Sequence, residues 1–195
     1  MSFPQTSPVI VIGLGNPILG DDGIGWRVAE RIRRSLSTAH QEGHTLFEYL
    51  PVEVDCLSLG GLSLMERLVG YQRALIIDSI TSNHNLPGTV SAFPLEGLPE
   101  QVACHMGSVH DTSLQTAIQV GRTMGASLPE QIHIVAIEVQ SVYEFSEELT
   151  DPVAAAAPIA EQVALDILAQ WADQETSDRG KNALMGCNFI KNQVK

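Results

Sequence analysis

Short apolar runs alternate along the chain with segments whose apolar residues recur every three or four positions. Each run is bounded by turn residues or charges, and the runs cover residues 8–13, 46–54, 73–78, 89–93 and 132–139. Short continuous apolar runs of this kind are typical of strands that are buried on both faces of a parallel sheet. The pattern therefore predicts five strands, the fourth entered through the turn at Pro87-Gly88.

Helical periodicity separates these runs. Residues 24–36 carry apolar side chains every fourth position, and residues 62–68 and 113–124 show shorter helical patterns. A last helix is predicted to turn Ile159, Val163, Ile167 and Trp171 inward, with Pro158 either in its first turn or at a kink. Strands that alternate with helices indicate an α/β fold with a mostly parallel sheet covered on both faces.

After position 172 the pattern is lost. Residues 173–195 are polar, include two glycines and show no sustained period. We therefore expect one domain over residues 1–172 and a mobile extension over 173–195.

The charge balance narrows the possible partners. The chain has 11 Lys and Arg against 23 Asp and Glu, a net charge of -12, and all of its lysines lie after position 172. Such an acidic chain would repel the phosphate backbone of a nucleic acid. Residues 1–172 contain no lysine, so they cannot form a P-loop, which requires one. We expect no nucleic-acid partner.

Cysteine usage and the start of the chain indicate the compartment. Cys56, Cys104 and Cys187 show no CxxC spacing, and the first residues show neither a basic segment nor an apolar run long enough for a leader or a membrane span. We expect a cytoplasmic protein without a membrane partner, and thiols that are small buried apolar groups.

Polar residues that follow the apolar runs are the candidates for chemistry, because ligands of parallel sheets bind beyond the carboxyl ends of the strands. Asp21 and Asp22 lie in the loop after the first run, Asp78 ends the third, and His110 precedes a predicted helix. Two carboxylates and an imidazole suit nickel or zinc. They could equally activate a water molecule without a metal, one acid as base and the imidazole as proton donor.

Each candidate also has a structural interpretation. Asp21 or Asp22 could cap the following helix, and His110 could be a surface or hydrogen-bonded histidine. Asp78 is harder to explain in this way, because a charge beside so apolar a run is costly unless it is paired or ligated. A rival site would combine His110 with Cys104 and His105, although this spacing matches no recognised metal motif.

The glycine-rich loop does not fit a dinucleotide site. Ile18 stands where the third glycine of G-x-G-x-x-G is required, and the acidic pair that follows would face a pyrophosphate with the wrong charge. No G-x-S-x-G pattern occurs after any predicted strand. Nicotinamide, flavin and serine-hydrolase chemistry are therefore disfavoured.

Residues 13–25, GLGNPILGDDGIG, resemble the N-terminal signature of the hydrogenase maturation endopeptidases. The resemblance continues through residues 75–79, 87–89, 149–153 and His110 with Leu114, and it covers residues 8–172 in consistent order. These proteases remove the C-terminal peptide from the large-subunit precursor of [NiFe] hydrogenases after nickel insertion.

The resemblance implies a three-layer α/β/α sandwich, phosphorylase/hydrolase-like, with a twisted, mostly parallel central sheet. It implies an aspartyl-type endopeptidase in which Asp22, Asp78 and His110 are the metal ligands and the catalytic residues. Many family members carry glutamate where Asp22 stands, so this carboxylate is one methylene shorter. The nickel would be presented by the substrate, with no organic cofactor, and the partner would be the large-subunit precursor, met by a monomeric enzyme.

Further roles follow from the same resemblance. Asp21 would cap the first helix, and the backbone path of the loop would depend on Gly13, Gly15, Asn16 and Gly23. The segment after the second strand would contact the precursor and set which hydrogenase is processed; its residues are Asp55, Cys56, Leu57, Gly60 and Gly61.

Two rivals remain at this point. Peptidyl-tRNA hydrolases resemble the chain at residues 13–17, but their continuation, with its catalytic histidine and asparagine, is absent here. A maturation chaperone that senses the metal without cutting would use the same three ligands.

Overall fold

A five-stranded sheet forms the centre of the computed structural model, in the order β2-β1-β3-β5-β4. The model describes residues 9–41, 50–82, 84–97, 113–140 and 145–191, with side chains as far as residue 177. β1, β2, β3 and β5 are parallel, and β4 is antiparallel to β5. The strands are β1 (Val9–Leu14), β2 (Val52–Leu57), β3 (Arg73–Ile80), β4 (Val90–Pro94) and β5 (Gln131–Glu138).

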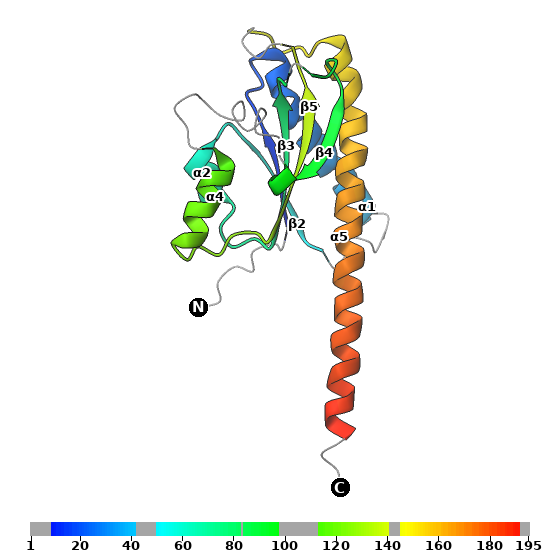
Figure 1. The fold of residues 1–195 in the computed structure, drawn as a ribbon. Coiled ribbons are helices and arrows are strands. Elements are labelled where there is room, and N and C mark those ends of the chain that lie inside the picture. Colours follow the sequence, from blue (N-terminus) through cyan, green and yellow to red (C-terminus); the bar gives the residue numbers. More distant parts are fainter. Residues whose placement is uncertain (1–8, 42–49, 83, 98–112, 141–144, 192–195) are drawn as a thin grey trace.

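Helices cover both faces of this sheet. α1 (Ile24–Gln41) and α5 (Asp151–Lys191) pack together on one face, and α2 (Gly61–Arg67) and α4 (Leu114–Thr123) pack together on the other (Figure 1). The α/β class and the mostly parallel sheet are confirmed, as is the three-layer arrangement.

Alternation along the strands divides the core in two. Val9 and Val11 of β1 face the layer of α1 and α5, whereas Ile10 and Ile12 face the layer of α2 and α4. Because successive strand residues point to opposite faces, a strand buried on both sides must be apolar throughout, which explains the continuous runs in the sequence.

Two strands end two or three residues later than the sequence predicts. β3 continues past Asp78 to Ile80, because its pairing with β5 extends to the pair Ile80 and Glu138. β2 runs over Val52–Leu57 and pairs with the whole of β1, so it includes residues that were expected to follow it. Asp78 is therefore inside its strand, not at the end of it.

The predicted inward face of the last helix is only partly correct: Trp171 is buried, Val163 and Ile167 are half-buried, and Ile159 is exposed. Ile159 is 55 % exposed, and the buried side chains of α5 lie on a neighbouring stripe. Much of this stripe is alanine, which allows α5 to lie close to α1 and the sheet, whereas the larger residues at 159, 163 and 167 remain at its margin. The buried residues are Val153, Ala156, Ala157, Ala160, Ala164, Leu168, Trp171 and Ala172.

α5 is also longer than the pattern predicts. It continues to Lys191 and extends well past the sheet (Figure 1), although no period marked residues 173–191 in the sequence. Pro158 lies inside the helix, not in its first turn. By length and composition alone, Asp151–Ser177 could cross a membrane, but its buried stripe packs on α1 and the sheet as a core helix does.

The close packing of α5 can be tested with two matched substitutions. Ala160→Leu places a larger side chain in a fully buried position, and we expect it to lower the free energy of unfolding by about 1–3 kcal/mol. Ala155→Leu makes the same change at an exposed position of the same helix and should change stability little. Urea denaturation of both variants measures the difference. Equal effects would contradict the assigned face.

Candidate functional site

The loop between β1 and α1 carries Asp22 in a short 3-10 turn, η1 (Gly20–Gly23). The Asp22 carboxylate points back across this loop. Its Oδ2 accepts the backbone N–H of Asn16 at 2.6 Å, and its Oδ1 accepts the hydroxyl of Ser79, on β3, at 3.1 Å. Asp22 therefore links the loop to the central strand, and neither of these two hydrogen bonds caps α1.

Asp78 lies next to Ser79 on β3, and its side chain is only 8 % exposed. Burial raises the pKa of the Asp78 carboxyl to about 8, and the charge of nearby Asp22 acts in the same direction. A hydrogen bond from the Ser79 backbone opposes this shift. The structure thus places two of the predicted ligands near each other. The pKa of one of them, Asp78, lies close to neutral pH.

Asp21 has a different role from the one predicted. Its carboxylate accepts the backbone N–H of Thr150 at 2.7 Å and the Thr150 hydroxyl at 2.8 Å. Thr150 immediately precedes α5, so Asp21 anchors the start of the last helix and not that of α1. The two adjacent aspartates point to different partners, since side chains in a tight turn diverge.

The backbone path of the loop depends on glycine where chain segments touch. Gly15 has a φ of 124°, and a Cβ at this position would lie 1.9 Å from the carbonyl oxygen of Asp22. At Gly13 a Cβ would lie 2.3 Å from the carbonyl oxygen of Gly25, so α1 could not approach β1. Both contacts are with backbone atoms, which cannot move aside cheaply. A Cβ on Gly23 would lie 2.8 Å from the Cα of Pro17.

A second segment, between β5 and α5, holds this loop from outside. The Ser146 N–H donates to the carbonyl of Ile18 at 3.1 Å, and the Gly20 N–H donates to the carbonyl of Ser146 at 2.6 Å. The Arg27 guanidinium donates to the carbonyl of Glu147 at 3.0 Å. With the Asp21 bonds to Thr150, these contacts fix the turn that presents Asp22.

His110, the third predicted ligand, lies outside the described residues, as do Cys104 and His105 of the rival site. Within the described ranges, no three His, Cys, Asp or Glu side chains are grouped closely enough to hold a metal ion. Asp22 and Asp78 are thus the described part of the predicted ligand set.

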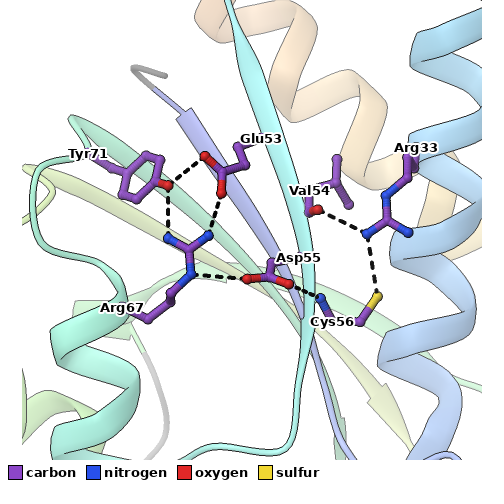
Figure 2. Close-up of polar contacts among 7 residues, drawn as sticks. All are labelled: Arg33, Glu53, Val54, Asp55, Cys56, Arg67 and Tyr71. Carbon is purple, nitrogen blue, oxygen red and sulfur yellow. Dashed lines mark hydrogen bonds and ion pairs between the residues drawn. The ribbon is translucent and has the colours of Figure 1, made fainter. Parts of the chain in front are cut away.

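Asp55, predicted to contact a partner, is engaged within the chain. Figure 2 shows its carboxylate with Arg67, whose guanidinium also contacts Glu53 and the Tyr71 hydroxyl. The Arg67 Nε to Asp55 Oδ2 distance is 3.0 Å. This network fastens α2 to β2, and it uses the side of β2 that Asp55 shares with Glu53.

The neighbouring residues of β2 face elsewhere. The Cys56 thiol lies near Arg33 of α1 (Figure 2), and burial raises the pKa of this thiol, as expected for a thiol with little reactivity. The carbonyl of Leu57 accepts both the Gly15 N–H and the Trp26 indole N–H. Two further predicted residues start α2: Gly60 precedes it, and Gly61, its first residue, has a φ of 50°.

Glu138 is a buried carboxylate that the sequence reasoning missed. It is 2 % exposed at the end of β5, and it accepts the backbone N–H and the hydroxyl of Ser82, each at 2.7 Å. These bonds anchor the segment that follows β3. The sequence signal was of the same kind as for Asp78, a charged residue directly after several consecutive apolar residues.

Large apolar side chains lie exposed around the carboxyl edge of the sheet. Ile18 is 50 % and Phe145 is 85 % exposed, and the two belong to the hydrogen-bonded segments described above. We call these residues, with one other in the loop after β2, one in the first turn of α2 and one in the loop after β3, the apolar rim. The three others are Leu59, Leu62 and Leu86.

The fold and the site define an α/β protein with an acidic site at the carboxyl edge of its sheet. A family model described as hydrogenase maturation protease matches residues 49–167. This range includes Asp78 and His110 and begins after Asp22. The chain belongs to the hydrogenase maturation protease family.

Individual relatives agree with this assignment. The chain is 25 % identical over 170 residues to the hydrogenase expression/formation protein HupD of Rhizobium leguminosarum, covering 86 % of this chain and 77 % of that one. It is 28 % identical over 134 residues to the hydrogenase 2 maturation protease of Escherichia coli, covering 69 % and 74 %.

A solved structure is similar too. The hydrogenase maturating endopeptidase HybD from E. coli superposes with a TM-score of 0.63 at 25 % identity, over 83 % of this chain and 92 % of that one. Sequence and structure thus indicate the same class of endopeptidase.

The buried carboxyl of Asp78 makes stability depend on pH. Its pKa rises from an ordinary 3.8 to about 8 on folding, so between these values the folded chain holds a proton that the unfolded chain has lost. The free energy of unfolding should therefore fall with rising pH, by up to about 1.4 kcal/mol per pH unit relative to Asp78→Asn.

Urea denaturation between about pH 5 and 7 measures this difference. Asp173→Asn, at an exposed position of α5, is the matched control and should keep the slope of the unsubstituted chain. Parallel stability curves for the unsubstituted chain and Asp78→Asn would contradict the assigned proton.

Proposed function

We propose that this endopeptidase removes the C-terminal peptide of a [NiFe] hydrogenase large-subunit precursor after nickel insertion. The observation that carries the proposal is the pair of carboxylates Asp22 and Asp78, which are close enough for their charges to interact and which lie toward the edge of the sheet where ligands of parallel sheets bind. The substrate, nickel included, would be recognised by these two residues together with His110.

Asp22 and Asp78 would have different roles in binding the substrate and activating the water. Asp22 is fixed by two hydrogen bonds and would contact the nickel that the precursor presents. Asp78, with a pKa of about 8, would give up its proton when the positive charge of the substrate arrives. The attacking water would then be polarised by the ion or deprotonated by a carboxylate. A nickel-free precursor would lack this shared contact and bind poorly.

The reaction would take place in the cytoplasm, with a single chain as the active unit. The enzyme would use no organic cofactor and would bind neither nucleic acid nor a membrane. The family supports the substrate class, because the family model and the E. coli relative are both described as hydrogenase maturation proteases.

The decisive experiment compares nickel-loaded with nickel-free precursor, following the released peptide by anaerobic mass spectrometry. We expect cleavage of the loaded precursor only, and loss of at least about a hundredfold in rate for Asp78→Asn and His110→Ala. Ser35→Ala, far from the site on α1, is the control and should cleave normally. Tight binding of the loaded precursor without cleavage would show a metal-sensing chaperone instead.

The apolar rim predicts where the precursor rests. Ile18→Ser and Phe145→Ser remove exposed apolar surface beside the site, so we expect each to raise the KM for precursor several-fold and to leave kcat and stability nearly unchanged. Met124→Ser is the matched control, because Met124 is 80 % exposed and follows α4 at the opposite edge of the sheet. Steady-state kinetics of the three variants measures KM and kcat and compares the rim positions with the control position. An equal effect of all three substitutions would rule out docking on the rim.

A further inference from the structure

Ser79 is the one residue in the described ranges that joins the two proposed catalytic aspartates. It follows Asp78 on β3, and its hydroxyl donates to Asp22 Oδ1 at 3.1 Å. Its backbone also hydrogen-bonds to the Asp78 carboxyl. Ser79 therefore touches both carboxylates while it is itself buried.

The position of Ser79 in the strand makes its hydroxyl informative. Leu75 and Ile77, two and four residues earlier on β3, face the core between the sheet and the layer of α1 and α5. The alternation of the strand brings Ser79 to the same face, where an apolar residue would continue the core. A buried hydroxyl needs a partner, and the partner here is Asp22.

Asp22 in turn has its orientation set from two sides. The Asn16 N–H holds Oδ2 at 2.6 Å, and the longer Ser79 bond holds Oδ1. With Ser79 absent, the carboxylate would keep one anchor and could rotate about it. A carboxylate that binds a cation is most effective when such outer hydrogen bonds fix its direction.

We propose that Ser79 is a positioning residue that aims the Asp22 carboxylate at the nickel of the bound precursor. This role rests on the proposed function, because it needs Asp22 to contact that ion. Loss of an outer hydrogen bond of this kind lowers metal affinity about 10–100-fold. Because Asp22 would grip the nickel in the bound ground state as well as during cleavage, the loss should fall on KM more than on kcat.

Steady-state processing of nickel-loaded precursor by Ser79→Ala and Ser79→Thr tests the role. We expect Ser79→Ala to raise KM at least about tenfold with kcat nearly unchanged, and Ser79→Thr, which keeps the hydroxyl, to restore most of the loss. Ser35→Ala is the matched control, because it removes another serine hydroxyl bonded to a carboxylate, that of Glu161 at 2.7 Å, away from the site. An unchanged KM in Ser79→Ala, or an equal loss in Ser79→Thr, overturns the proposal.

A second measurement tests the role of Ser79 independently of the proposed cleavage reaction. Urea unfolding of Ser79→Ala, Asp22→Ala and the double variant forms a cycle that reports the Ser79–Asp22 contact without any substrate. Additive effects would show that Ser79 does not hold Asp22, and would overturn the positioning role even if the precursor is cleaved. Failure of the unsubstituted chain to cleave would instead refute the proposed function, and with it the role of Ser79.

Discussion

Burial of the sheet on both faces is the constraint on which the molecule depends. Central strands covered by helices on both sides are mainly apolar, so polar side chains collect toward the carboxyl ends of these strands, as Asp78 and Ser79 do on β3, and in the loops that follow. In parallel strands those ends meet at one edge. For this reason Asp22 and Asp78, which are far apart in the sequence, are close enough for their charges to interact.

The buried carboxyls at this edge are accommodated in two physical ways. Asp21 accepts two hydrogen bonds from Thr150, and Glu138 accepts two from Ser82. Among the described residues, Asp78 accepts a hydrogen bond from the Ser79 backbone, and its burial, with the nearby charge of Asp22, raises its pKa instead. The carboxyl that the fold stabilises least as an anion is the one proposed to respond to a cation.

The sequence predicted the sheet and the aspartate pair because periodicity and the carboxyl-edge rule depend on local pattern. The sequence pattern could not predict which side chains form hydrogen bonds with residues far away in the chain. Asp21 resembled a helix cap, but its donor is Thr150, 129 residues away. The face of α5 was misjudged because hydrophobicity ranks Ile159 above Ala160, whereas close packing against α1 favours the smaller side chain. Asp55 was predicted to follow the second strand. In the structure it lies within β2, paired with β1, and its carboxylate accepts a hydrogen bond from Arg67.

The Asp21–Thr150 link has a consequence for the order of events during synthesis. The loop that carries Asp22 emerges near the start of the chain, but its anchor is made only when the segment before α5 follows. Such distant contacts form late, because a long loop must close first. The acidic edge is therefore completed only when almost the whole domain has been translated, and a truncated nascent chain would lack the anchor of the turn that carries Asp22.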